Sequence, residues 1–179
     1  MPRVPKMPVR GFTLVELLMV LMIVAIIAGI GVPAFNQFVR DGQMTSRANS
    51  INLALQLARS EAIGRGRPVT ACASTLSSDP PTCDGSNWAD GWLVTVDGNA
   101  SGSSVSVDEV LRVDSSDTKV KSTSASPGFV RFLGDGLRDE SNTAGDQTIR
   151  LEQPDCGKDG ARVIEISATG RARVTKADC

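Results

Sequence analysis

The chain of 179 residues is 41% hydrophobic and 22% charged, an ordinary globular composition that excludes a wholly disordered protein. Nineteen Lys and Arg against twenty Asp and Glu give a net charge of −1, so no global positive field draws the protein to nucleic acid. The chain has no His, which removes the commonest general base and zinc ligand, and it has no Gly-x-Ser-x-Gly nucleophile motif. We therefore expect no enzyme activity, no cofactor and no metal.

The N-terminal part departs sharply from this average. A short leader carries Arg3, Lys6 and Arg10 with no acidic residue, and an apolar run extends from Phe12 to about residue 35. About 20 apolar residues suffice to cross a membrane as a helix, and the basic leader predicts a cytoplasmic N-terminus. A secretory signal peptide or a simple anchor is the alternative, but no clear small-residue cleavage site follows the run. One carboxylate, Glu16, lies inside it, where a charge is costly without a partner.

The sequence RGFTLVEL at residues 10–17 closely resembles the class III leader junction of type IV pilins and of type II secretion pseudopilins. The resemblance implies that a prepilin peptidase cuts between Gly11 and Phe12 and methylates the new amine, which leaves a mature chain of net charge −4. Glu16 becomes the fifth mature residue, and the amine of a neighbouring subunit stabilises its carboxylate during assembly. Pro33 is similar to the helix-kinking Pro that many pilins carry.

The helical pattern continues beyond the apolar run. Apolar residues recur at steps of three or four from Met44 to Ala62, whereas Arg47 and Arg59 fall off this stripe and are expected on a solvated face. Gly64, Gly66 and Pro68 end the helix. The pattern predicts one helix of 52 residues from Phe12 to Ile63.

The remainder reads as short strands and turns. Alternation and turn residues predict strands at residues 68–74, 91–97, 105–113, 128–133, 148–152, 162–167 and 171–174, with a Ser-rich loop or frayed strand at 115–127. The segment from Asp97 to Asp108 fits the spacing of a calcium-binding loop. A strand precedes it, however, and Gly, Asn and Ser suit a β-turn, so we favour a hairpin between the second and third strands.

Three further segments, LQLARSEAI at 55–63, DGWLV at 90–94 and IEISATGR at 164–171, are similar to the GspH/FimT group of the type IV pilin-like superfamily. The resemblance implies an α+β fold in which a long N-terminal α-helix packs on antiparallel β-sheet. It divides the chain into a cleaved leader (1–11), a transmembrane or filament-core helix (12–35), an amphipathic second half of that helix (36–66) and a periplasmic β-rich head (67–179).

The four cysteines fit an oxidising periplasm, where an even number indicates disulfides. Three pairings are possible, and sequence proximity favours Cys72 with Cys83 and Cys156 with Cys179. A zinc site built from all four is disfavoured because no Cys-x-x-Cys pair occurs.

The C-terminal hairpin holds a candidate binding surface. If Ile164 and Ile166 face inward, Arg171 and Arg173 point outward together, because side chains of a strand alternate. The sequence GRAR at 170–173 resembles the Gly-Arg-x-Arg motif of minor pilins that bind DNA. The candidate contacts to double-stranded DNA are Arg171, Arg173, Lys176 and Arg162. A solvated face that protects an edge strand is an equally good interpretation.

These patterns together lead us to expect a minor pilin of a type IV pilus. It would be a single-pass protein of the inner membrane with a periplasmic head, assembled with other minor and major pilins at or near the pilus tip, with weak DNA binding in DNA uptake. A minor pseudopilin of a type II secretion system is the alternative.

Overall fold

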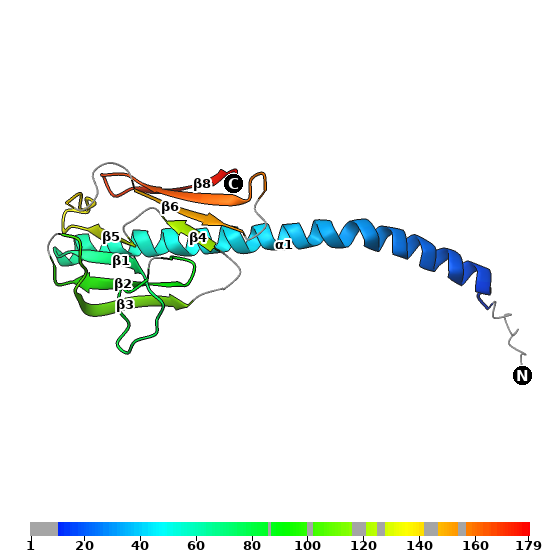
Figure 1. Cartoon of the computed structure of the whole chain (residues 1–179), viewed down its shortest axis with the longest axis horizontal. Coiled ribbons are helices and arrows are strands. Elements are labelled where there is room, and N and C mark those ends of the chain that lie inside the picture. Colours follow the sequence, from blue (N-terminus) through cyan, green and yellow to red (C-terminus); the bar gives the residue numbers. More distant parts are fainter. Residues whose placement is uncertain are drawn as a thin grey trace, which may run out of the picture. The chain divides into compact units, whose positions relative to one another are not determined.

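The computed structural model describes residues 11–85, 87–99, 102–115, 121–124, 128–141, 147–153 and 157–179. These residues contain one helix, α1 (Leu14–Arg65), and eight strands (Figure 1). The strands are β1 (Val69–Ala73), β2 (Gly91–Asp97), β3 (Val107–Ser115), β4 (Lys121–Ser124), β5 (Phe129–Phe132), β6 (Gln147–Glu152), β7 (Ala161–Ile166) and β8 (Ala172–Ala177). The chain forms two compact units, residues 1–39 and residues 40–179.

Helix α1 begins and ends at local signals in the sequence. The hydroxyl of Thr13 accepts a hydrogen bond from the backbone amide of Glu16 at 3.2 Å, which is the geometry of an N-terminal cap. At the other end, Gly66 has a φ of +60°, a left-handed conformation that closes the helix. The 52-residue helix is confirmed, shifted by two residues at each end from the predicted 12–63.

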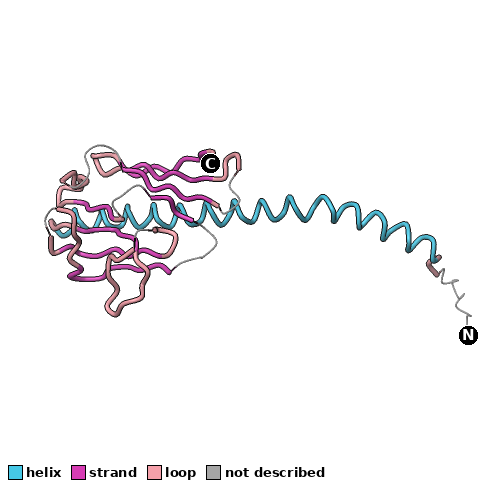
Figure 2. The backbone as a smooth tube through the Cα atoms, in the orientation of Figure 1, coloured by secondary structure: helices cyan, strands magenta, loops and turns pink. Residues whose placement is uncertain are grey.

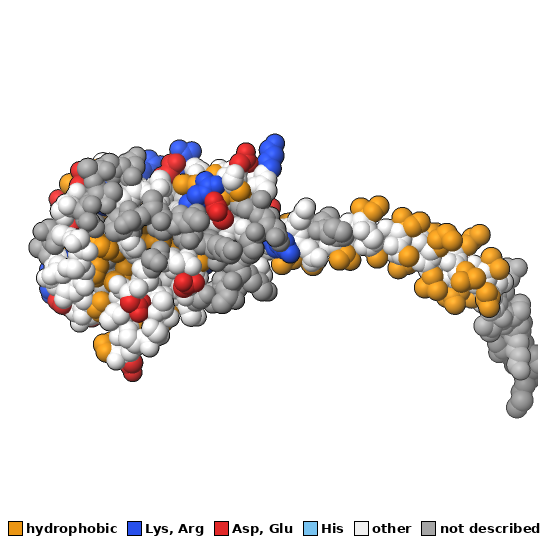
Figure 3. Space-filling view, in the orientation of Figure 1, with side chains coloured by type: hydrophobic (Ala, Val, Ile, Leu, Met, Phe, Trp, Pro, Cys, Tyr) orange, Lys and Arg blue, Asp and Glu red, His pale blue; other side chains and the backbone are white. Residues whose placement is uncertain are grey.

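The described part of the first unit, residues 11–39, is an exposed apolar helix and the three residues before it. Its large hydrophobic side chains are exposed along the whole segment, with Phe12 83% exposed and Phe38 75% exposed (Figure 3). By length and composition the helix can cross a membrane. Surface this apolar is stable only in lipid or against other proteins.

The second unit, which we call the head, contains the rest of α1 and two antiparallel sheets. One sheet has the strand order β3-β2-β1-β5 and the other β4-β6-β7-β8. The helix lies between the two groups of strands (Figures 1 and 2). This is the expected α+β fold. The β2–β3 hairpin also forms as expected, with β3 two residues further along than predicted.

The core of the head gathers around the second half of α1. The predicted apolar stripe is buried, and it consists of Met44, Ala48, Ile51, Leu55, Ala58 and Ala62. One sheet adds buried residues such as Val94 and Phe132, and the other adds Ile164 and Ile166. Side chains from both sheets therefore pack on this one helix.

The expectation that Arg47 lies on a solvated face is wrong. Arg47 is only 7% exposed, not solvated. Its guanidinium donates to the carboxylate of Asp114 at 3.2 Å and to the carbonyl of Trp88 at 3.1 Å, and these bonds tie α1 to the β-rich part. Within the Ser-rich segment 115–127, for which the sequence left a loop or a frayed strand open, Lys121–Ser124 form the strand β4, which pairs with β6.

Candidate functional site

The predicted processing segment lies directly before α1. Gly11 and Phe12 precede the helix, and Phe12 is fully accessible at 83% exposure. Glu16 is exposed in the first turn, where the positive end of the helix dipole favours a carboxylate. None of the described residues forms an ion pair with it. Pro33 lies within α1, but its side chain, like residues 1–10, is outside the described part.

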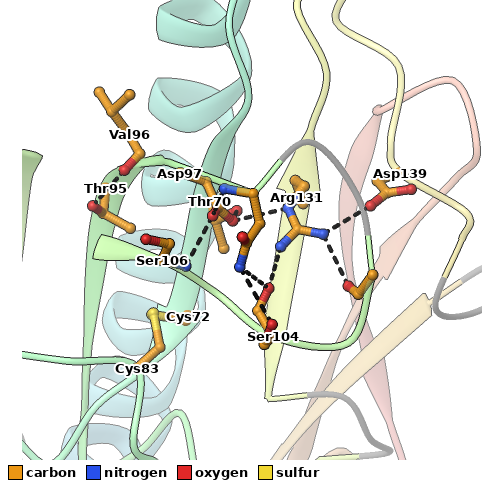
Figure 4. A network of polar contacts seen from close by, with 12 residues as sticks. Thr70, Cys72, Cys83, Thr95, Val96, Asp97, Ser104, Ser106, Arg131 and Asp139 are labelled. Atoms are coloured by element: carbon orange, nitrogen blue, oxygen red, sulfur yellow. Dashed lines mark hydrogen bonds and ion pairs between the residues drawn. A yellow bond between two sulfur atoms is a disulfide. The ribbon is translucent and has the colours of Figure 1, made fainter. Parts of the chain in front are cut away.

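A buried ion-pair network organises the head (Figure 4). The side chains of Arg131 and Asp97 are fully buried, and the guanidinium Nε donates to Asp97 Oδ2 at 2.8 Å. Arg131 Nη1 donates to Asp139 Oδ2 at 2.9 Å, and Thr70 donates its hydroxyl hydrogen to Asp97 at 2.7 Å. The charges therefore compensate one another inside the protein, as a buried pair requires.

The same network closes the β2–β3 hairpin. Asp97 Oδ1 accepts hydrogen bonds from the backbone amides of Asn99 and Ser106, both at 2.9 Å. Arg131 also donates to the carbonyls of Gly102 and Ser104. Both carboxylate oxygens of Asp97 accept hydrogen bonds from protein donors, which fits the predicted hairpin turn between β2 and β3. Among the described residues no group of three His, Cys, Asp or Glu side chains is placed to hold a metal.

Two carboxyl groups of the head, Asp139 and Asp84, have lowered pKa values. Burial disfavours the charge of Asp139, but hydrogen bonds from Ser141 and the guanidinium of Arg131 outweigh burial and hold the pKa of Asp139 below its usual value. In the loop after β1, hydrogen bonds from the backbone and hydroxyl of Thr75 hold the pKa of Asp84 low. Asp84 thereby fixes the segment next to Cys83.

A disulfide joins Cys72 of β1 to Cys83, with 5.6 Å between their Cα atoms. This is the pairing that sequence proximity favours. Cys179 is also disulfide-bonded, and Cys156, its expected partner, lies outside the described residues. The Cys72–Cys83 bond closes the loop that follows β1 onto the core, because Cys72 is itself fully buried.

The C-terminal hairpin has the expected alternation. Ile164 and Ile166 are buried, Ala172 and Val174 pack against the core, and Arg171 and Arg173 are exposed. Gly170 forms the turn with a φ of +77°. In the register, Arg173 lies opposite Glu165, so one negative charge shares its face of the sheet.

Two of the four candidate cations do not join this face. Arg162 is 2% exposed, and its guanidinium donates to the carbonyls of Asp159 and Ala161 and to Thr45 Oγ1. Lys176 is exposed but pairs with Arg162 in the register, on the opposite side of β8 from Arg173. The predicted row of four cations is therefore wrong, and only Arg171 and Arg173 remain.

Two protein families match this chain, one over the N-terminal apolar segment and the other over most of the head. The family described as "Prokaryotic N-terminal methylation motif" matches residues 6–32, and the family described as "Type II transport protein GspH" matches residues 47–170. The chain belongs to the GspH family.

The solved structures that resemble this GspH-family chain include two crystal forms of the type IV minor pilin FimU of Pseudomonas aeruginosa. One has a TM-score of 0.59 at 23% identity and covers 77% of this chain and 92% of FimU. The other has a TM-score of 0.55 at 26% identity and covers 73% of this chain and 91% of FimU. No curated protein sequence gives a significant match.

Family and fold together give the general role. The protein is a minor pilin or pseudopilin, a structural subunit and not an enzyme. The methylation motif and the family imply processing by prepilin peptidase and assembly with other pilins. The apolar helix with this motif indicates a membrane anchor before assembly.

Proposed function

We propose that this protein is a minor pilin of a type IV pilus, cleaved after Gly11, held in the inner membrane by residues 12–35 and assembled at or near the tip. Residues 36–66 would continue the helix, and residues 67–179 would form a periplasmic head. The observation that carries the proposal is the exposed apolar surface of α1 with a single carboxylate, Glu16, in its first turn. That surface needs lipid before assembly and other pilin helices after it.

The first test is the processing site. Mass spectrometry of the protein extracted from membranes should find N-methylated Phe12 as the first residue. An intact Met1, or a cut near Ala28 or Ala34, would contradict the proposal.

The second test is assembly. The Glu16→Ala variant should still enter the membrane but be depleted from sheared pili, because its carboxylate no longer pairs with a neighbour's N-terminal amine. Glu16→Gln, which keeps the size without the charge, should behave like Glu16→Ala. Normal incorporation of both variants would show that the carboxylate does not direct assembly.

The similarity to GspH favours a second candidate, a minor pseudopilin of a type II secretion system. Deleting the protein separates the two. Loss of surface pili with normal secretion supports the pilus, whereas loss of secretion with normal pili supports the alternative.

We also propose weak, sequence-independent binding of double-stranded DNA through Arg171 and Arg173, which the structure leaves exposed. Two phosphate contacts would give a slope of about −1.8 for log K against log salt, at roughly −0.9 per phosphate. The full chain in nonionic detergent should retard DNA at low salt, and Arg171→Glu with Arg173→Glu should not. Equal binding by the variant, or none by the wild type, removes this part of the proposal.

A further inference from the structure

The peptide bond that the proposed processing cuts, between Gly11 and Phe12, lies outside α1. Gly11, Phe12 and Thr13 precede the helix, and all three residues are exposed. Among the described residues no backbone amide donates to the Gly11 carbonyl. A carbonyl inside a helix, by contrast, accepts a hydrogen bond from the amide four residues later and is withheld from a peptidase. The residue at which α1 begins therefore decides whether this bond can be cut.

Thr13 sets the start of α1, because it meets both criteria of a helix N-cap. Its carbonyl accepts the first hydrogen bond of the helix from the Leu17 amide at 3.2 Å. Its hydroxyl accepts a hydrogen bond from the Glu16 amide, also at 3.2 Å. The hydroxyl thereby satisfies one of the amides that a helix leaves without a partner in its first turn. This contact uses the backbone of Glu16 and does not depend on the carboxylate.

The sequence contains a second possible cap two residues earlier. Glycine is about as good an N-cap as threonine, so α1 could also begin after Gly11. In that register the Gly11 carbonyl would accept a hydrogen bond from the Val15 amide, and the bond to be cut would enter the first turn. A Cβ at Gly11 would have no atom within 4 Å, so no packing contact holds this segment in place. The choice between the two starts is therefore local and depends on the Thr13 hydroxyl.

We infer that Thr13 is a positioning residue for processing, because its hydroxyl starts α1 at Leu14 and keeps the Gly11 carbonyl free for prepilin peptidase. The inference rests on the proposed cleavage after Gly11. Thr13 acts on its own chain and needs no contact with the peptidase. Any side chain that caps a helix should therefore replace it, whereas a side chain of the same shape without a hydroxyl should not.

Cleavage of the full chain in nonionic detergent, by membranes that contain prepilin peptidase, tests this role. Thr13→Val keeps the shape of threonine, and its initial rate of cleavage should fall about fivefold, the effect of losing one N-cap hydrogen bond. The matched controls are Thr13→Ser and Thr13→Asn, whose side chains cap a helix at least as well as threonine. Both should be cleaved at the wild-type rate or faster. Mass spectrometry of the new N-terminus measures each rate.

Amide exchange provides a second readout that does not involve the peptidase. The Val15 amide has no hydrogen-bond partner among the described residues, so in the uncleaved wild type it should exchange rapidly with deuterium. Thr13→Val should protect this amide, because the shifted helix bonds it to the Gly11 carbonyl. Thr13→Ser and Thr13→Asn should exchange like the wild type. Nuclear magnetic resonance of the labelled full chain in detergent resolves the Val15 signal.

Three results would overturn the inference. One is cleavage of Thr13→Val at the wild-type rate. Another is slow cleavage of Thr13→Asn as well, because the peptidase would then recognise threonine itself. The third is slow cleavage of Thr13→Val with unchanged exchange at Val15, since the start of the helix would not have moved. A wild-type chain that is not cut after Gly11 is different, because that result refutes the proposed function.

Discussion

Replacing Asp97 by Ala is expected to destabilise the head strongly. Its carboxylate accepts hydrogen bonds from Arg131, Thr70 and two backbone amides, and it is 1% exposed. The substitution leaves the buried guanidinium paired with Asp139 alone and removes the acceptor of its Nε hydrogen bond. Breaking a buried pair in this way costs about 3–5 kcal/mol in the free energy of unfolding.

Urea titration of the full chain in nonionic detergent measures this cost. Both Trp residues, Trp88 and Trp92, are buried in the head, so their fluorescence reports on this unit alone. The control is Asp108→Ala, because Asp108 pairs with Arg67 on the surface at 3.2 Å and its loss should cost about 0–1 kcal/mol. Adding Arg131→Met to Asp97→Ala should cost less than the sum of the single changes, since each single change already breaks the same Asp97–Arg131 contact.

The reasoning is refuted if Asp97→Ala costs no more than Asp108→Ala. It is also refuted if the double variant is destabilised by the full sum, because the two side chains would then contribute independently.

Three other predictions concern the head. Replacing Cys72 and Cys83 together by Ala should lower the free energy of unfolding by about 2–4 kcal/mol in the same titration, and an unchanged midpoint would contradict a stabilising loop closure. The pKa of Asp139 is lowered on folding, so its ionised carboxylate stabilises the folded head. This contribution to the free energy of unfolding is complete above the unfolded-state pKa of about 3.9, and it is lost as the pH falls through the folded-state pKa. In Asp139→Asn the free energy of unfolding should therefore fall less steeply at acid pH than in the wild type. Parallel curves for the two proteins would contradict this role of Asp139. Gly170→Ala should cost about 1–3 kcal/mol for its left-handed backbone, with more from the contact to Gly136, so a neutral effect would show that the turn relaxes.

Local patterns predicted most of the fold. The apolar stripe from Met44 to Ala62, the strand at residues 91–97 and the inward alternation of Ile164 and Ile166 depend on residues a few positions apart. Such patterns are visible in one sequence because a helix or strand repeats its environment at a fixed period. The glycines that end α1 and form the last turn are equally local.

The charged interior could not be predicted in this way. Arg47, Arg131 and Arg162 look like solvated residues in the sequence, and each is buried in the structure. Their partners lie far along the chain, at a sequence separation of 34 for Arg131 and Asp97 and of 117 for Arg162 and Thr45. Only the tertiary fold makes such pairs, so a charge count along the sequence overestimates the positive surface of the hairpin.

The alternation of side chains along β8 divides the candidate DNA-binding residues between the two sides of the strand. Arg171 and Arg173 are separated by two positions and share a side of β8, whereas Lys176 follows Arg173 by three and lies on the other side. The alternation was sufficient to place Lys176. The position of Arg59 beside Arg171 could not be predicted, because it depends on two glycine turns that meet only in the folded head.

The arrangement of two sheets around one helix has a consequence for the order in which the head folds during synthesis. The stripe on α1 is synthesised first, but Ile164, Ile166 and Val174, which cover it from the second sheet, are close to the last residues to leave the ribosome. Contacts this distant in sequence make the closing steps slow. Until they close, the stripe is open to proteases and to other apolar segments at the membrane surface. Limited proteolysis of chains truncated before β7 should therefore cut within the second half of α1, at sites that the complete chain protects.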